Sequence, residues 1–217
     1  MNKYAPLLAV CATLLGSASA LAASSTDVSV TGMITPAACT PSLSGAGSFD
    51  FGKISAQDLN QDKGTVFESS FQRLTIACSS PTRFAIDGID NRSGSAAAAH
   101  PANYGLGLNG TEKIGYYSLQ IPSTGLNADG DTDVTRMQSG NGGSSWSMVG
   151  SAFPLFLFHR SSPRLSGFAV QGAAEPSPIS TLSADLQVRM VIAKASGLTL
   201  TDDINIDGSS SIEVTYL

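Results

Sequence analysis

Residues 26–39 read TDVSVTGMITPAAC, and residues 211–217 read SIEVTYL. The first stretch follows the apolar run at the start of the chain, and the second ends the chain. In both stretches, apolar and polar residues alternate. Successive side chains of a strand point to opposite faces, and period-two alternation therefore predicts extended strands. In the first stretch, the positions that share one face are Val28, Val30, Gly32 and Ile34. In the second stretch they are Ile212, Val214 and Tyr216. A strand that runs to the last residue leaves no following strand to cover its neighbour, so we expect a sandwich that is one strand short.

The sequence between these ends also alternates in short runs separated by Gly, Pro, Asn and Ser clusters. The alternating runs are Phe49 and Phe51; Leu74, Ile76 and Cys78; Phe84 and Ile86; Leu119 and Ile121; Phe156 and Phe158; and Leu186, Val188, Met190 and Ile192. No stretch has the period of an amphipathic helix. The pattern predicts an all-β sandwich of mostly antiparallel strands around one core. Residues 123–145 are poorly patterned and are interpreted as a loop or insertion.

Composition narrows the class of protein. Charged residues make up 13% of the 217 residues, against about 25% in an average globular protein, which argues against disorder and coiled coils. The formal net charge of -5 and the pI near 4.8 leave no basic surface to hold phosphates, which argues against nucleic-acid binding.

The first residues have the features of a secretory signal peptide. Lys3 supplies a positive start, residues 5–15 are apolar, and small residues at 18–22 suit signal peptidase. The apolar run is too short for a membrane anchor, which needs about 20 residues. We therefore expect residues 1–22 to be cleaved, after Ala20 or Ala22, and the chain to be exported to the periplasm.

Cleavage removes Cys11 and leaves Cys39 and Cys78. An even pair in an oxidising compartment predicts a disulfide bond. The chain-entropy model gives a loop of this size roughly 4 kcal/mol of stabilisation. The two histidines, His100 and His159, lie near neither cysteine in the sequence, so we expect no metal site.

The order and spacing of these features resemble the subunits of chaperone–usher fimbriae (pilins). Val28-x-Val30-x-Gly32-x-Ile34 before Cys39 is similar to the donor-strand extension of that family. Residues 49–54 resemble its short strand and glycine, Cys78 its second cysteine, and Ile212, Val214 and Tyr216 its last strand with the penultimate tyrosine. Further similarity points to a branch of fimbria-like proteins known mainly as a domain of unknown function. The motifs that carry this similarity are Cys78-Ser79-Ser80-Pro81-Thr82, Asp90-Asn91-Arg92, Gly105-Leu106-Gly107 and Ile114-Gly115-Tyr116-Tyr117.

The resemblance implies an incomplete immunoglobulin-like β-sandwich at residues 37–217 that lacks its last strand, preceded by a donor-strand extension at 23–36. It also implies a function: a structural fimbrial subunit that polymerises by donor-strand exchange and supports cell adhesion at the cell surface. The implied partners are a periplasmic chaperone, an outer-membrane usher and neighbouring subunits, with a host or surface glycan as a further candidate. Two features depart from the family: the chain is longer than most simple pilins, and Ile204 stands where a glycine is expected, with Gly208 nearer the end.

Several alternatives stay open. Residues 28–34 and 212–216 could be ordinary strands of a complete sandwich. The acidic run Asn127 to Asp133 could bind calcium, although a solvated turn is favoured because the glycine and distal glutamate of a calcium loop are missing. Trp146 could stack on a sugar, but a core position is favoured.

The functional alternative is a carbohydrate-binding adhesin or a soluble periplasmic fimbria-like binding protein. An extension directly after the signal favours an internal fibre position over a tip adhesin. No nucleophile elbow, phosphate loop or zinc-protease motif occurs, so the chain is predicted not to be an enzyme and to need no cofactor.

Overall fold

The computed structural model describes residues 29–30, 38–170 and 172–217, and most of the regular structure in them is extended strand. The helical turns among these residues are three short 3-10 helices: η1 (Ser44–Gly47), η2 (Ala56–Asp58) and η3 (Ala195–Gly197). No helix in the described ranges is long and apolar enough to cross a membrane. The prediction of an all-β chain is confirmed.

The larger sheet is built around one long strand, β14. Its main path runs β1 (Cys39–Leu43), β3 (Gln72–Thr82), β14 (Ile179–Ile192), β8 (Gly115–Ile121) and β12 (Leu155–Phe156). Shorter strands β2 (Thr65–Glu68) and β9 (Asn127–Ala128) pair with β14, and β5 (Tyr104–Gly105) pairs with β8. Every second side chain of β14 from Leu182 to Met190 is buried, which is the pattern expected of a strand with one face on the core.

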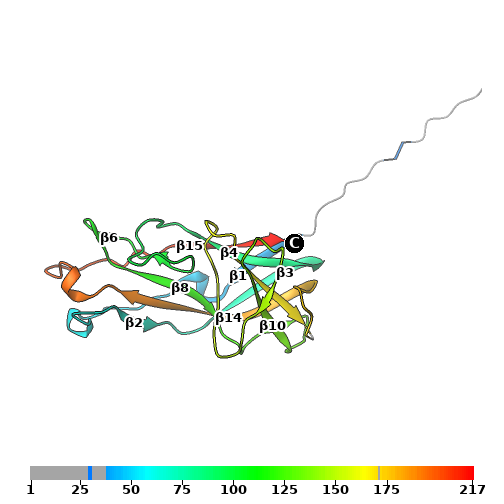
Figure 1. Cartoon of the computed structure of the whole chain (residues 1–217), viewed down its shortest axis with the longest axis horizontal. Coiled ribbons are helices and arrows are strands. Elements are labelled where there is room, and N and C mark those ends of the chain that lie inside the picture. Colours follow the sequence, from blue (N-terminus) through cyan, green and yellow to red (C-terminus); the bar gives the residue numbers. More distant parts are fainter. Residues whose placement is uncertain (1–28, 31–37, 171) are drawn as a thin grey trace, which may run out of the picture. The chain divides into compact units, whose positions relative to one another are not determined.

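The second sheet ends in the C-terminal strand. Its order is β11 (Ser147–Met148), β10 (Val134–Ser139), β13 (Leu165–Val170), β4 (Phe84–Asp90) and β15 (Ser210–Tyr216), and Figure 1 shows β4 and β15 side by side. A separate hairpin joins β6 (Leu108–Asn109) to β7 (Glu112–Lys113). All pairings between the named strands are antiparallel.

One apolar core joins the two sheets. Leu74 of β3, Leu119 of β8 and Leu186 of β14 belong to the same buried cluster as Ile86 of β4 and Phe168 of β13. Two antiparallel sheets that share a core are consistent with a β-sandwich.

A disulfide bond joins Cys39 to Cys78, as predicted. The two cysteines are directly opposite each other in the antiparallel pairing of β1 with β3, with their Cα atoms 3.9 Å apart. The first residue of β1 is therefore held to the sheet both by the ladder and by a covalent bond.

Two expectations were wrong. Phe49 and Phe51 alternate but lie in no strand, because Asp50 Oδ1 accepts the N–H of Gly52 at 2.7 Å in a tight turn where Gly52 has φ 62°. Residues 123–145 are not simply a loop, because they contain β9 and all of β10. Strand β10 hides its pattern, since Arg136 and Met137 are adjacent in the sequence and both are buried.

Candidate functional site

The last strand, β15, presents an apolar face that its own sheet only half covers. It pairs with β4 so that Ile212 lies opposite Gly88, Val214 opposite Ile86 and Tyr216 opposite Phe84. Directly opposed side chains of an antiparallel pair share a face, and Phe84 and Ile86 are buried in the core. Ile212, Val214 and Tyr216 therefore face the core side. Ile212 and Val214 are nevertheless only half-buried, and Tyr216 is exposed.

Strands β1 and β15 come together at one end. The backbone N–H of Cys39 donates to Tyr216 Oη at 2.9 Å, so the disulfide and the penultimate tyrosine mark the same point. Within the described residues, the strand partner of β1 is β3 and that of β15 is β4. The edges of β1 and β15 that face each other are therefore unpaired by any strand of the described residues.

A groove of about 590 Å³ opens between these two strands. Leu43 of β1 and Ile212 of β15 belong to its walls, and buried side chains of the central strands β3, β8 and β14 form its floor. The floor residues include Leu74, Leu119, Leu186, Val188 and Met190. None of the described residues that line the groove carries a charge. An apolar floor between two open strand edges is a site for an added strand, because it offers side-chain pockets together with main-chain donors and acceptors.

The groove continues into a second hollow of about 740 Å³. Phe49, Phe51 and Ile206 line both spaces. Ile54, Leu198, Leu200 and Ile204 add apolar side chains to the second hollow, and Asp50, Lys53, Asp202 and Asp203 add charged ones. Ile204, which stands where the pilin family has a glycine, thus lies in the second hollow.

Gly208 lines the groove itself. A Cβ atom added there would lie 2.9 Å from Tyr117 Cε1 and 3.2 Å from Leu106 Cδ2. The chain therefore passes close to the core at this point, and a side chain would push this wall of the groove outward.

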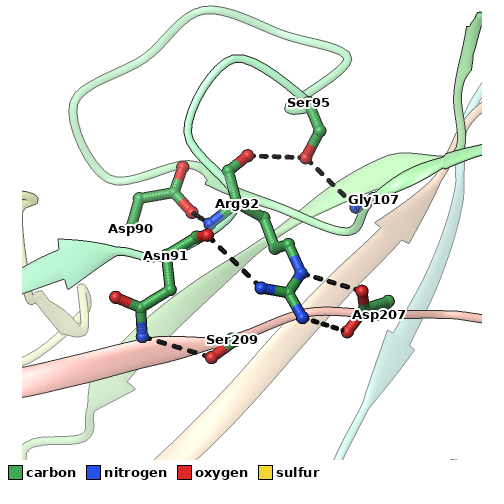
Figure 2. Close-up of polar contacts among 7 residues, drawn as sticks. All are labelled: Asp90, Asn91, Arg92, Ser95, Gly107, Asp207 and Ser209. Atoms are coloured by element: carbon green, nitrogen blue, oxygen red, sulfur yellow. Dashed lines mark hydrogen bonds and ion pairs between the residues drawn. The ribbon is translucent and has the colours of Figure 1, made fainter.

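An ion pair holds the segment that leads into β15, and its two residues are far apart in the sequence. Figure 2 shows Arg92 reaching Asp207 with two parallel hydrogen bonds, from Nε to Oδ2 at 2.8 Å and from Nη2 to Oδ1 at 2.7 Å. This bond from Arg92 holds the pKa of the Asp207 carboxyl below its ordinary value. Such bidentate pairs fix orientation as well as distance. We call this pair the clamp.

Hydrogen bonds to the backbone of Arg92 hold the clamp arginine in place (Figure 2). Asp90 Oδ1 accepts the N–H of Arg92 at 3.0 Å, and its Oδ2 accepts the N–H of Gly105 at 3.1 Å. Ser95 Oγ donates to the carbonyl oxygen of Arg92 at 2.7 Å and accepts the N–H of Gly107 at 3.1 Å. The motifs 90–92 and 105–107 are therefore parts of one polar cluster.

This cluster also holds the start of β15. Asn91 Nδ2 donates to Ser209 Oγ at 3.2 Å, and the N–H of Asn91 donates to the carbonyl oxygen of Ser209 at 3.0 Å. Asp207 N–H donates to the carbonyl oxygen of Leu106 at 3.0 Å. The sequence alone did not reveal these contacts. Asp-Asn-Arg after a strand signals a turn, but nothing local links it to a carboxylate 115 positions later.

Most of the predicted donor strand lies outside the described residues, including Val28, Gly32 and Ile34. Val30 is described, and 93% of it is exposed. The structure thus presents the groove and its walls, while the predicted occupant stays a prediction.

The other residues singled out from the sequence have structural contacts. Asp129 accepts the N–H of Ser180 at 2.9 Å and that of Thr181 at 2.7 Å, so the acidic run ties a turn to β14. Across the described residues, no group of three His, Cys, Asp or Glu side chains is placed to hold a metal ion. Trp146 is half-buried beside Gly167 of β13, where an added Cβ would lie 2.8 Å from the indole. Trp146 does not belong to the buried core cluster, so the core position favoured from the sequence is not confirmed.

Comparison with known proteins gives relatives but no function. A family model described as a protein of unknown function (DUF1120) matches residues 28–125. Protein GltF of Escherichia coli (strain K12) is 29% identical over 256 aligned positions, which cover 100% of this chain and 99% of GltF. The uncharacterized protein YhcF of the same strain is 28% identical over 246 positions that cover 100% of both chains. These matches are consistent with a fimbria-like family of unknown function, and neither protein's name is that of a chaperone–usher pilin.

Proposed function

We propose that this chain is a structural subunit of a chaperone–usher fimbria, polymerising when the N-terminal extension of one copy fills the groove of the next. The groove between β1 and β15 carries the proposal. It places buried core side chains at the bottom of an opening flanked by two strand edges that pair with no strand of the described residues. An immunoglobulin-like sandwich without its last strand has this arrangement, and the added strand would complete it.

The segment proposed to fill the groove is residues 28–34. It has seven residues, as β15 does, so the two strands can pair along their whole length. Val28, Val30 and Ile34 share one face, and burying each is worth about 1.5–3 kcal/mol. Gly32 lets the two backbones approach where a side chain would collide. The segment has no charged residue, which suits a groove lined by none.

The chain connection limits how the segment could enter the groove of its own copy. Strand β1 begins beside Tyr216 and has Leu43 in the groove wall with Ser210, so β1 and β15 run in opposite directions. To enter its own groove, the segment before Cys39 would have to reverse within residues 35–38 and lie parallel to β15. A segment from a second copy is free of this constraint and can enter in either direction. A strand that is antiparallel to β15 is parallel to β1, so pairing stability alone selects neither occupant.

The open groove also implies a partner before assembly. Apolar surface next to unpaired strand edges promotes aggregation. We therefore propose that a periplasmic chaperone covers the groove after export, that an outer-membrane usher presents the subunit, and that the mature fibre lies at the cell surface.

A peptide of residues 26–36 tests the proposal. The full chain is purified from the periplasm with its candidate chaperone, released, and heated with and without the peptide. A ligand at 100 times its dissociation constant stabilises the folded state by about 2.7 kcal/mol, so the melting temperature should rise by several degrees. The control peptide carries Val30→Asp, which puts a charge against the apolar floor.

A stable, folded monomer whose melting temperature does not change with the peptide would show that strand exchange is wrong. Equal stabilisation by the control peptide would also contradict it. Removing Tyr216 and Leu217 should weaken chaperone capture, because Tyr216 ties the end of β15 to the first residue of β1.

A further inference from the structure

A second opening, which we call the loop hollow, has about 750 Å³ and shares no lining residue with the groove. It lies between residues 93–103 and residues 159–163, beside the end of β4. Both histidines of the chain, His100 and His159, line it. Small-molecule sites have volumes of about 300–1,000 Å³ and a few fixed polar groups, so its polar side chains decide what it could bind.

Three of these side chains, His100, Asn103 and Lys113, each make one hydrogen bond within the protein and have a further polar group that can bond to a ligand. His100 Nδ1 accepts the N–H of Ala102 at 3.2 Å, so the proton of the neutral ring is assigned to Nε2, which becomes a donor. Asn103 Nδ2 donates to the carbonyl oxygen of Ala98 at 3.0 Å, and its Oδ1 is then oriented as an acceptor. Lys113 Nζ donates to the carbonyl oxygen of Ala96 at 3.1 Å and has two further N–H groups.

The opposite side of the hollow is also fixed. The N–H of His159 donates to the carbonyl oxygen of Pro101 at 2.9 Å, and its ring stands edge-on to Tyr104 with centroids 6.0 Å apart. His159 Nδ1 shares a hydrogen bond with Ser161 Oγ. The hydroxyls of Ser161 and Ser162 add groups that can both donate and accept.

The charges around the hollow do not favour an anion. Lys113, Arg160 and Asp90 line it. Arg160 pairs with Asp87 at 3.1 Å and also with Glu213, which together neutralise it and add negative charge behind the wall. The two cations, Lys113 and Arg160, and the three carboxylates, of Asp87, Asp90 and Glu213, give a summed formal charge of -1. A phosphate or carboxylate would therefore meet no net positive field.

We propose that the loop hollow binds a neutral saccharide of one or two rings. Such a ligand presents hydroxyls that donate and accept, as the fixed His, Asn, Lys and Ser groups require. It also presents C–H faces that can pack on Ala98, Ala99 and Pro101 of the same wall. This proposal does not depend on strand exchange, since the hollow and the groove are separate.

Titration of the full chain by NMR tests it, using a panel of neutral hexoses, N-acetylhexosamines and their disaccharides. Glucuronate and inorganic phosphate form separate arms, and the series is run with and without the 26–36 peptide. At least one neutral sugar should give saturable shifts of amides in residues 93–103 and 159–163. Ala98→Trp, at an exposed lining position, should weaken that binding at least tenfold.

Ala152→Trp, at an exposed alanine outside the hollow, is the matched control and should leave binding unchanged. Lys113→Met should weaken binding without filling the space, and melting temperatures verify that each variant is folded. The proposal is overturned if no neutral sugar shifts these amides, if only the anions do, or if Ala98→Trp and Lys113→Met both bind as the parent does. Loss of the peptide effect with retained sugar binding would refute strand exchange alone.

Discussion

Replacing both Cys39 and Cys78 by alanine is expected to lower the free energy of unfolding by roughly 4 kcal/mol. The disulfide closes a loop with a sequence separation of 39. In the chain-entropy model a loop of this size restricts the unfolded chain by about 13 cal/mol/K, or roughly 4 kcal/mol at 25 °C. Since domains are stable by only about 5–15 kcal/mol, this is a large fraction of the total.

Loss of the disulfide should destabilise the groove wall formed by β1 before the rest of the fold. Cys39 is the first residue of β1, its partner in the ladder is Cys78, and its N–H bonds to Tyr216 Oη. Without the disulfide, the five-residue strand β1 is held along one edge by hydrogen bonds alone. We therefore expect faster amide exchange in β1 than in β14, and less stabilisation by the 26–36 peptide.

Urea denaturation of the parent, the double variant and the reduced parent measures the free energy of unfolding, and the last two should agree. Thr40→Ala, at an exposed position of the same strand, is the control and should change stability by less than about 0.5 kcal/mol. A loss below about 1 kcal/mol for the double variant, with β1 amides still protected, would refute the reasoning.

Three further outcomes are expected. Asp207→Asn should speed amide exchange in residues 199–209, because it weakens the clamp, whereas the exposed control Asp203→Asn should not; equal rates would contradict the clamp's role. Arg136→Met should cost about 1–3 kcal/mol in urea denaturation, since Arg136 is buried and donates to three carbonyl groups, and a loss under about 0.5 kcal/mol would refute this. Burial raises the pKa of Asp87 above 3.8, so its contribution to stability falls as pH rises through the window between 3.8 and the raised value. Asp87→Asn should remove that fall from melting curves taken across the acidic range, and an unchanged profile would argue against it.

Alternation of apolar residues in the sequence identified several of the longer strands. The runs at residues 74–78, 119–121, 186–192 and 212–216 all lie in strands of the structure. The disulfide followed from cysteine number and compartment. These features were accessible because each depends on residues close together in sequence or on a single pairing.

Strands β10 and β13 could not be predicted in the same way. Arg136 breaks the apolar pattern of β10 and is still buried, because carbonyl groups of Ile121, Gly150 and Phe153 accept from its guanidinium. In β13, five consecutive residues are buried, so no alternation appears. The clamp was equally hidden, since it depends on how the fold brings Arg92 to Asp207.

Three polar contacts hold β15 and the segment before it to other parts of the fold. Only 13% of the residues are charged. Four of the charged side chains form ion pairs that involve this strand or the segment before it. Arg92 holds Asp207 near the strand's start, and Arg160 holds Glu213 in its middle. Tyr216 bonds to β1 at its end. Exposed ion pairs add little to stability, but these three contacts fix the position of an edge strand that has one strand partner among the described residues. Because a shift of one residue would turn every side chain of an added strand to the wrong face, a groove that accepts such a strand needs a wall that does not move.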